Sequence, residues 1–433
     1  MKFYLYRTGV SLLLIFSIIG CSENDDVISP DITIMYPSEY MIYMPGDSIR
    51  ISITVSDETQ LKWIDVVITD ANRIPVDKQI ALPVNSNPQH HNLYYFIENM
   101  QLKEGDYYIR VRAGDGTNVK NKYRKIRIGT LTKTLQEVVV ITGDPLHHYT
   151  INILDTAMNL TPAAAYSGVF SDATVSSLFR LLVVAGKSNG SCFAINMNNH
   201  SVKWQLQQGG APGLICYEKL HAAEKKFFLG YTEGVVRGYN YNGVQQFTAT
   251  MPFQRIPGEI TVLDDTYLVV AEKDKAGTGS YINLYFLVSG NAWVSYKLTD
   301  NAGVVALVPV DSRDVMIVLN SAGQGKVLRY NSLSNTVSEP VALPSGEVMG
   351  AVACDGNTML VLHSAGIYCY DATGTVYPWK NGTFSFLRYD PVNQWVFAAD
   401  NTNLYAFSFP AGQVIFMVPL SDPVLELMLV YNN

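Results

Sequence analysis

The stretch VLDDTYLVV (residues 262–270) contains the unit that decides the fold of this chain. An apolar segment ends in an acidic turn, where aspartate side chains bond their own backbone, and a wholly apolar run follows. Runs of this kind recur seven times, and their last residues lie 44, 45, 41, 48, 44 and 35 positions apart. They occupy residues 138–140, 182–184, 227–229, 268–270, 316–318, 360–362 and 395–397. A period of about 43 residues in a sequence of short strands is typical of a β-propeller.

Seven copies of the run predict a seven-bladed β-propeller over residues 130–433. Runs that are apolar on both faces suit strands covered by neighbouring blades. The first unit begins directly with its second strand at Glu137, whereas the last strand, residues 425–431, is followed by no second strand. We therefore expect the C-terminal strand to pair into the first blade and close the ring.

One repeat unit, AINMNNHSVKW (residues 194–204), resembles the repeat of PQQ-type propellers, and residues 370–374 and 407–412 match it more loosely. Quinone-binding dehydrogenases of that class usually have eight blades, with a docking tryptophan in most of them. In this chain only Trp204 fits that position. The resemblance therefore implies the fold, and we expect no cofactor.

Residues 31–129 predict an all-β module of a different kind, a small immunoglobulin-like sandwich. The segment SIRISITV (residues 48–55) alternates without a break, so its branched side chains face a core and its polar ones face water. Turn signals at Gly46 and Gly105 introduce strands. The Cys-Trp-Cys signature of true immunoglobulin domains is absent.

The first residues predict export and lipidation. Lys2 and Arg7 precede a short apolar run, and IIGC (residues 18–21) reads as a lipobox with Cys21 as the lipidated residue. The predicted segments are a signal peptide (residues 1–20) and an acidic tether (residues 21–30), ahead of the two folded modules.

Two features resemble surface lipoproteins of Bacteroidota. Tyr43 and residues 46–49, 55–57 and 61–63 resemble their PKD-like N-terminal modules, which usually serve as spacers. Residues 22–26 (SENDD) resemble the acidic signal that follows the lipidated cysteine. The resemblance implies an outer-membrane protein at the cell surface; a spacer that faces the periplasm is the alternative.

Composition and motifs exclude several classes of chemistry. The formal net charge is -7, and removal of Lys2 and Arg7 with the signal would make it -9, which argues against a nucleic-acid partner. The histidine pairs at residues 90–91 and 147–148 are adjacent, so on strands they point to opposite faces and cannot share a metal ion. We expect no metal site, and free buried thiols at Cys192, Cys216, Cys354 and Cys369.

Catalysis by a glycan hydrolase or lyase would need paired acidic groups at the propeller axis. Most acids in the repeats fall on the turns between first and second strands, and no spacing brings the others together. We therefore assign no catalytic residue and expect a protein that is not an enzyme.

The turns between first and second strands lie on one face of the propeller, and the loops between second and third strands lie on the other. We expect a ligand on this second face, because its loops are longer and more varied. Aromatic rings beside amides and charges suit glycans or peptides. The candidate ligand-binding residues are Tyr231, Glu233, Arg255, Lys273, His363, Trp379 and Asp400. Packing for Trp379 and plain solvation for the charged residues are the alternatives.

The first module carries a second candidate surface. Alternation places Arg110, Arg112, Lys125 and Arg127 on one outer face, which predicts a basic patch for anionic lipid headgroups or a partner. A solvated sheet face is the alternative.

Together these features predict a non-catalytic binding or accessory lipoprotein of a nutrient uptake system that takes a glycan or a peptide. The resemblance implies a TonB-dependent porin and its substrate-binding lipoprotein as partners, with outer-membrane lipid holding the acylated Cys21. The alternatives are a glycan hydrolase or lyase, which requires clustered carboxylates at the axis, and a protein scaffold, which requires an exposed apolar patch.

Overall fold

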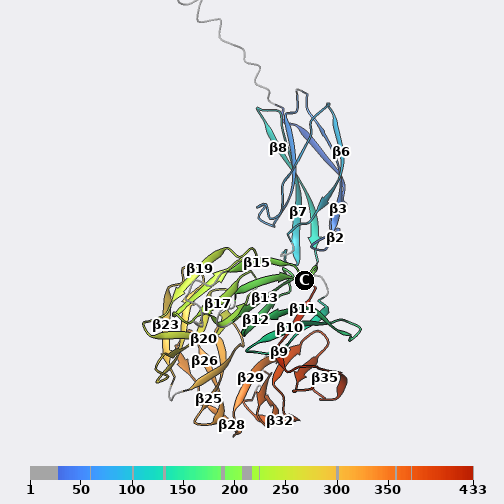
Figure 1. Cartoon of the computed structure of the whole chain (residues 1–433). Helices are drawn as coiled ribbons and strands as arrows, with labels where there is room; N and C mark the ends of the chain where they lie inside the picture. Colours follow the sequence, from blue (N-terminus) through green and yellow to red (C-terminus); the bar gives the residue numbers. More distant parts are fainter. Residues whose placement is uncertain are drawn as a thin grey trace, which may run out of the picture. The chain divides into compact units, whose positions relative to one another are not determined.

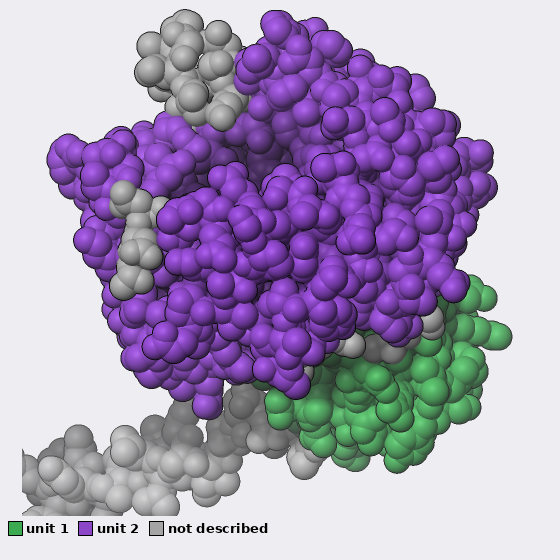
Figure 2. Space-filling view, turned by 90° about the horizontal axis from the view of Figure 1, so that it is seen from below, with its two compact units in different colours: residues 1–132 green, residues 133–433 purple. Residues whose placement is uncertain are grey.

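The chain contains only strands and turns in the residues that its computed structural model describes: 28–58, 60–99, 102–129, 133–186, 191–206, 217–223, 225–298, 302–355, 358–371 and 373–432. Within these ranges no helix is long and apolar enough to span a membrane. The chain divides into two compact units, residues 1–132 and 133–433 (Figures 1 and 2). The predicted signal peptide and Cys21 lie outside the described residues.

The first unit is built from two sheets around one apolar core. One sheet has the order β1 (Asp31–Tyr36), β3 (Ser48–Ser56) and β6 (Gln89–Phe96). The other has the order β2 (Ile42–Tyr43), β8 (Val119–Ile128), β7 (Gly105–Gly114), β4 (Trp63–Thr69) and β5 (Ile80–Leu82). The alternation in β3 positions the core, because Ile49, Ile51 and Ile53 are all fully buried while Ser48 and Arg50 are exposed.

The second unit contains seven antiparallel sheets in its described residues (Figure 1). The first, called the β9 sheet, has the order β11 (Leu160–Ser167), β10 (His148–Leu154), β9 (Leu135–Asp144) and β37 (Val424–Tyr431). The next three are β12 (Phe170–Ser176), β13 (Leu181–Gly186), β14 (Cys192–Asn196), β15 (Val202–Leu206); β16 (Tyr217–Ala222), β17 (Phe227–Tyr231), β18 (Val235–Tyr239), β19 (Gln245–Thr250); and β20 (Arg255–Leu263), β21 (Tyr267–Asp274), β22 (Ser280–Phe286), β23 (Ala292–Lys297).

The remaining three sheets repeat this order. They are β24 (Gly303–Pro309), β25 (Asp314–Ser321), β26 (Gln324–Asn331), β27 (Thr336–Val337), with β28 (Val341–Ser345) also paired to β26; β29 (Val348–Asp355), β30 (Thr358–His363), β31 (Gly366–Tyr370), β32 (Val376–Asn381); and the β34 sheet, β33 (Phe386–Asp390), β34 (Trp395–Ala399), β35 (Asn403–Ser408), β36 (Val414–Pro419).

The second unit is a β-propeller. Its innermost strands form a closed ring, in which each contacts the next in the order β12, β16, β20, β24, β29, β33, β37 and back to β12. The second strands are buried on both faces, as in β13, where all six residues are buried. This two-sided burial explains why the runs in the sequence are apolar at every position.

The turns between third and fourth strands share one backbone feature. Each contains a residue at positive φ, and these residues are Met158, His200, Gly243, Gly290, Asn335, Gly374 and Gly412. Glycine adopts this conformation at no steric cost, and Asn and His tolerate it better than other side chains do. The position therefore recurs in all seven sheets, and Met158 is the only apolar side chain that it carries.

The last strand joins the two ends of the propeller. β37 pairs antiparallel with β9, with Leu427 opposite Val140 and Met428 opposite Val139. It also binds both neighbouring sheets: the Tyr431 hydroxyl donates to buried Asp390 on β33 (3.2 Å), and the Tyr431 N–H donates to Ser177 after β12 (3.1 Å).

The described cysteines are buried and form no disulfide: Cys192, Cys354 and Cys369. Burial raises the pKa of the Cys192 thiol to about 12, which makes it unreactive at neutral pH. Cys216 lies outside the described residues.

Replacing Leu427 by alanine tests the closing strand. Leu427 is fully buried between β37 and its neighbours, so Leu427→Ala should lower the free energy of unfolding by about 2–5 kcal/mol. Urea denaturation measures this change, and Val414→Ala on the outer strand β36, where Val414 is 55% exposed, should change it by less than about 0.5 kcal/mol. Equal urea midpoints for the Leu427 variant and the parent would contradict a stabilising role for the closing strand.

Candidate functional site

The innermost strands are irregular at one recurring place. Six of them carry a register shift against the second strand, at Phe170/Asp172, Tyr217/Lys219, Pro257/Ile260, Val304/Ala306, Val348/Gly350 and Val424/Glu426. A β-bulge turns the following side chain away from its regular direction, which is why bulges often lie beside functional sites. β33 alone pairs with its neighbour, β34, without a shift.

Five charged side chains lie at this irregularity or level with it. Asp172, Lys219 and Glu426 directly follow a bulge, Glu259 lies within one, and Arg388 lies on the regular strand β33. Their strands β33, β37, β12, β16 and β20 are consecutive in the ring. We call these five residues the axial charge cluster.

The cluster is joined by ion pairs that cross from sheet to sheet. Lys219 Nζ lies 3.1 Å from Glu259 Oε1 and 3.6 Å from Asp172 Oδ2. A guanidinium nitrogen of Arg388 lies 2.6 Å from Glu426 Oε1. Asp172 Oδ2 also accepts the backbone N–H of Leu220 at 2.8 Å, so this carboxylate links β12 to β16 directly.

Solvent reaches the cluster although it lies on the innermost strands. The side chains of Lys219, Glu259 and Arg388 keep 32%, 23% and 38% of their surface exposed. Figure 2 shows that the surface of this unit is hollowed. Water therefore reaches Lys219, Glu259 and Arg388, whereas Asp172 and Glu426 are buried behind them.

The other two innermost strands carry small residues at the equivalent place. The residue after the bulge is Ala306 on β24 and Gly350 on β29. A Cβ atom built on Gly350 would meet no atom within 4 Å, so the chain leaves open space there. The ring thus has an arc of charged side chains and an arc without them.

The surroundings shift the protonation of the cluster. Burial opposes the charge on Lys219, but the carboxylates of Asp172, Glu259 and Glu426 outweigh it and raise the pKa of the ammonium group. Burial raises the pKa of Glu259 above its ordinary value, and Lys219 only partly opposes that rise. Burial likewise raises the pKa of Glu426, against the opposing effect of Arg388.

His221 follows Lys219 by two residues on β16, on the same side of the strand. Burial, together with the neighbouring positive charge of Lys219, lowers the pKa of its imidazole to about 4. The ring is therefore neutral at physiological pH and can both donate and accept a hydrogen bond. Among the described residues, no group of three or more His, Cys, Asp or Glu side chains is arranged to hold a metal ion.

Three of the predicted ligand-binding residues lie near one another, but their polar groups bind other residues of the protein. Tyr231 is buried, and its hydroxyl hydrogen-bonds that of Tyr239 at 2.6 Å. Glu233, in the following turn, forms an ion pair with Arg237 at 2.7 Å. Arg255, at the start of β20, lies 3.5 Å from Glu272 and stacks on the Tyr281 ring.

The other four predicted residues are dispersed. Lys273 is exposed on β21, where it lies opposite Ile256 of β20. His363 is fully buried at the end of β30, so a ligand on the loop face would not reach it. Trp379 packs against Phe407 and donates its indole N–H to the Pro410 carbonyl (2.8 Å), which is the packing role given above as its alternative.

The Asp400 carboxylate accepts backbone N–H groups of the turn in which it lies. Burial raises the pKa of its carboxyl, but the N–H groups of Thr402 and Asn403, both at 2.7 Å, outweigh burial and lower it. The predicted loop residues therefore do not form one site. The reason is that these loops are short hairpins whose polar side chains bond their own turns.

The four residues of the predicted basic patch lie on one face, but carboxylates neutralise much of their charge. Arg110, Arg112, Lys125 and Arg127 do share the outer face of one sheet, opposite the buried Ile109, Val111, Ile126 and Ile128. Each is nevertheless paired with a carboxylate: Arg110 and Arg112 with Asp65 (3.9 and 2.9 Å), Lys125 with Asp106 (2.7 Å) and Arg127 with Glu104 (2.8 Å). Because Arg110 and Arg112 share Asp65, three carboxylates face four cations, so most but not all of the positive charge is neutralised and the attraction for anionic lipid is weakened.

Trp204, the residue of the quinone-type resemblance, fills space between two sheets. Its indole N–H donates to the Tyr241 carbonyl at 3.1 Å, and a Cβ on Gly243 would lie 2.9 Å from its ring. Trp204 therefore docks its own sheet against the turn of the next sheet.

The axial charge cluster escaped prediction from the sequence. Each member is a single charged residue within a short first strand, as in FSDATVS (residues 170–176) and VLELMLVY (residues 424–431). Read alone, each looks like an ordinary solvent-facing position. The distance from each charge to the apolar run that follows it differs from sheet to sheet, and the run that pairs with the strand of Glu426 lies at the other end of the unit, so spacing in the sequence does not reveal their common level.

Comparisons with known proteins give distant likenesses only. The chain is similar to a quinonprotein alcohol dehydrogenase-like protein from Bacteroides thetaiotaomicron (12% identity, 94% of this chain and 99% of that chain, TM-score 0.47). It is also similar to BamB from Moraxella catarrhalis (15% identity, 72% and 91%, TM-score 0.44) and to the β-propeller domain of Cps50 (Swd1) from Myceliophteria thermophila (11% identity, 59% and 88%, TM-score 0.48). No protein-family model matches the chain, and no curated protein does. The fold assignment therefore rests on the sheet order and the ring of innermost strands.

Replacing Lys219 by methionine tests the cluster. Lys219→Met would leave Asp172 and Glu259 side by side without their ammonium, and should lower the free energy of unfolding by up to about 3 kcal/mol at pH 7. Part of that loss should return as the pH falls to 5, because a carboxyl with a raised pKa in the folded state binds a proton more readily there than in the unfolded chain. Urea denaturation at both pH values measures this, with Lys275→Met on an exposed turn as control. A loss that is the same at both pH values would show that the carboxylates are not coupled through Lys219.

Proposed function

We propose that this chain is a lipid-anchored binding protein of the bacterial outer membrane that captures a glycan or a peptide without transforming it. The observation that carries the proposal is the axial charge cluster, where charged side chains from five adjacent strands lie together and three of them, Lys219, Glu259 and Arg388, are reached by solvent. On the two remaining innermost strands Ala306 and Gly350 leave room beside it.

The chemistry of the cluster favours a ligand with many polar groups. Lys219 and Arg388 only donate hydrogen bonds, the carboxylates accept them, and neutral His221 does either. Glycan hydroxyls and peptide amides can satisfy both kinds of group, and a peptide end also supplies charge. Because every charge in the cluster already has a partner of opposite sign, binding requires no proton transfer, which favours capture over catalysis.

We also propose a specific architecture for the two units. The seven sheets are the blades of a seven-bladed propeller closed by its C-terminal strand, and residues 31–129 form an immunoglobulin-like or PKD-like spacer. Two sheets with one shared core and a strictly alternating β3 support the spacer. Cys21 carries the lipid, and the acidic residues after it favour the cell surface.

In this proposal the protein is an accessory component of a nutrient uptake system. Its expected partners are a TonB-dependent porin and the substrate-binding lipoprotein of that porin, as the resemblance to Bacteroidota surface lipoproteins implies. The lipid holds the chain at the membrane, the spacer raises it, and the propeller presents the axial cluster.

A glycan hydrolase or lyase is the second candidate, and one observation favours it. Asp172 and Glu259 both contact one ammonium group, so two carboxylates lie within the span that such enzymes use. The raised pKa of Glu259 would suit a general acid. Release of reducing sugar by the parent protein, lost in Glu259→Gln, would establish this activity in place of simple capture.

A protein scaffold is the third candidate. The outer strand β36 exposes Val414, Ile415 and Met417 at 55%, 42% and 54%, which is apolar surface of the kind that protein partners cover. This surface is an edge strand and involves none of the axial cluster.

Filling the open space at Gly350 tests capture at the axis. A panel of oligosaccharides and peptides should yield a ligand, and Gly350→Leu should weaken its binding at least tenfold because the new side chain enters the space beside the charges. Isothermal titration calorimetry measures the affinity, and Ala292→Leu at an exposed position of β23 is the matched control. A ligand bound equally by the Gly350 variant would move the site away from the axis.

Metabolic labelling tests the anchor. An alkyne fatty acid fed to expressing cells should label the parent chain and leave Cys21→Ser unlabelled, because only the thiol of Cys21 lies in a lipobox. Mass spectrometry of the N-terminal peptide locates the label. Equal labelling of the two chains would contradict lipidation at Cys21.

A further inference from the structure

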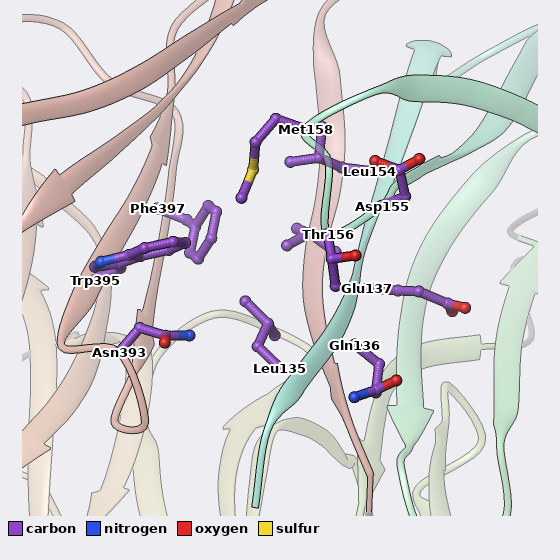
Figure 3. Close-up of a pocket in the computed structure, with 11 residues that line it drawn as sticks. Leu135, Gln136, Glu137, Leu154, Asp155, Thr156, Met158, Asn393, Trp395 and Phe397 are labelled. Atoms are coloured by element: carbon purple, nitrogen blue, oxygen red, sulfur yellow. The ribbon is translucent and has the colours of Figure 1, made fainter.

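A pocket opens between the β9 sheet and the β34 sheet, away from the axial charge cluster. Its volume is about 200 Å³, and its lining comes from β9, β34, the end of β10 and the turn that follows β10. Figure 3 shows Leu135, Met158, Trp395 and Phe397 pointing into a common gap. Pockets also open between the β9 sheet and the sheet of β13 (about 430 Å³) and between the sheets of β25 and β30 (about 90 Å³), and the pocket at Trp395 differs from both in its tryptophan and phenylalanine wall.

The interior of the pocket is apolar, and its edge is polar. Trp395 is held in place by edge contacts with Phe397 and Phe416, with ring centroids 6.2 and 5.9 Å apart. Thr156 and Asn393 contribute a hydroxyl and an amide to the lining (Figure 3). The site therefore offers a preformed aromatic wall with a few polar groups, which is the usual composition of a small-molecule site.

Two acidic residues of the lining are occupied elsewhere. Glu137 Oε1 binds Arg180 at 2.9 Å while its Oε2 is buried without a hydrogen-bond partner, and Asp155 accepts the N–H groups of Ala157 and Asn159, both at 2.9 Å. In Figure 3 both carboxylates point away from the gap between Trp395 and Leu135. A cationic ligand would gain little from them, so the pocket suits a neutral molecule.

Asn393 determines which hydrogen-bonding group a neutral ligand needs at the edge of the pocket. Its amide nitrogen donates to Asp390 Oδ2 at 2.6 Å, which identifies the other atom of the amide as the carbonyl oxygen. A ligand hydroxyl could donate to that oxygen. The pocket thus matches a ring compound with one hydroxyl group.

Met158 borders the pocket in an unusual backbone conformation. It has φ 64°, a conformation that costs a bulky side chain about 1 kcal/mol or more. The same turn position holds glycine in four of the seven sheets, and Asn or His in two others. Glycine would relieve the strain here too, but the Met158 side chain packs on the apolar cluster that contains Leu154 and Phe397, and it also projects into the pocket.

We propose that this pocket binds a small neutral ring compound that carries a hydroxyl group, such as a phenol or an alicyclic alcohol. The ring lies against Trp395 and beneath Met158, and its hydroxyl donates to Asn393. Apolar cavities of about 150 Å³ already admit benzene, so 200 Å³ accommodates a substituted six-membered ring. The site is independent of the axial cluster and of the glycan or peptide proposed to bind there.

The test uses 4-ethylphenol as the probe and the full chain as the protein. Isothermal titration calorimetry should show one saturable site, and ethylbenzene, which lacks the hydroxyl, should bind at least fivefold more weakly. Met158→Gly should reduce the affinity for 4-ethylphenol at least tenfold while leaving the melting temperature equal or higher, because the strain at φ 64° is relieved.

The matched control is His200→Gly, which makes the same change at the same turn position of the next sheet. It should leave the affinity for 4-ethylphenol unchanged. Saturable binding lost only in Met158→Gly supports the proposal. Absence of saturable binding to the parent, equal affinity in Met158→Gly, or an equal loss in His200→Gly would overturn it.

Discussion

The propeller depends on the pairing of β37 with β9, strands from opposite ends of the unit. Without β37 the β9 sheet would lack its innermost strand, and β33 and β12 would each lose a neighbour in the ring. The pairing forms only after the chain between these strands has been brought into position, so its loop-closure entropy is opposed by the burial of residues such as Leu427 and Val430. A ring closed by one strand is stable only if that strand is well packed on both sides.

The closing strand also contributes Glu426 to the axial charge cluster. The pair between Glu426 and Arg388 joins β37 to β33, while Asp172 and Lys219 join β12 to β16. Charges placed inside a protein lose hydration, and an ion pair seldom recovers more than that loss. The cluster avoids much of this cost because several of its side chains still reach solvent. In the function proposed above, a ligand would replace this water, so ring closure and ligand capture would depend on the same residues.

The sequence predicts strands well where burial is two-sided or strictly alternating. The run at residues 268–270 is buried throughout in β21, and the isoleucines of residues 48–55 are buried in β3, because in both cases the pattern reflects the sheet alone. Side-chain roles in the site were less predictable. Tyr231 and His363 stand at strand ends that the repeat places on the loop face, yet each is buried by neighbours. Lys219 and Glu426 are brought together only by ring closure, which no local pattern encodes.

The seven repeats can also be compared with one another, position by position. Seven equivalent turns reveal what the backbone requires at one position, so a departure at Met158 can be separated from the general rule that the other six follow. A comparable departure marks the axis, where five innermost strands carry a charge at a level that is small and uncharged on the other two. The first departure lies at a turn beyond the third strand of the β9 sheet and the second on innermost strands, so no side chain serves both. The two sites come closest where Phe397 of the pocket lies opposite Arg388 of the cluster on the paired strands β33 and β34. Met158 and Gly350 belong to sheets that are not neighbours in the ring, so substitutions at these two positions should act additively, and the two assignments can be tested separately.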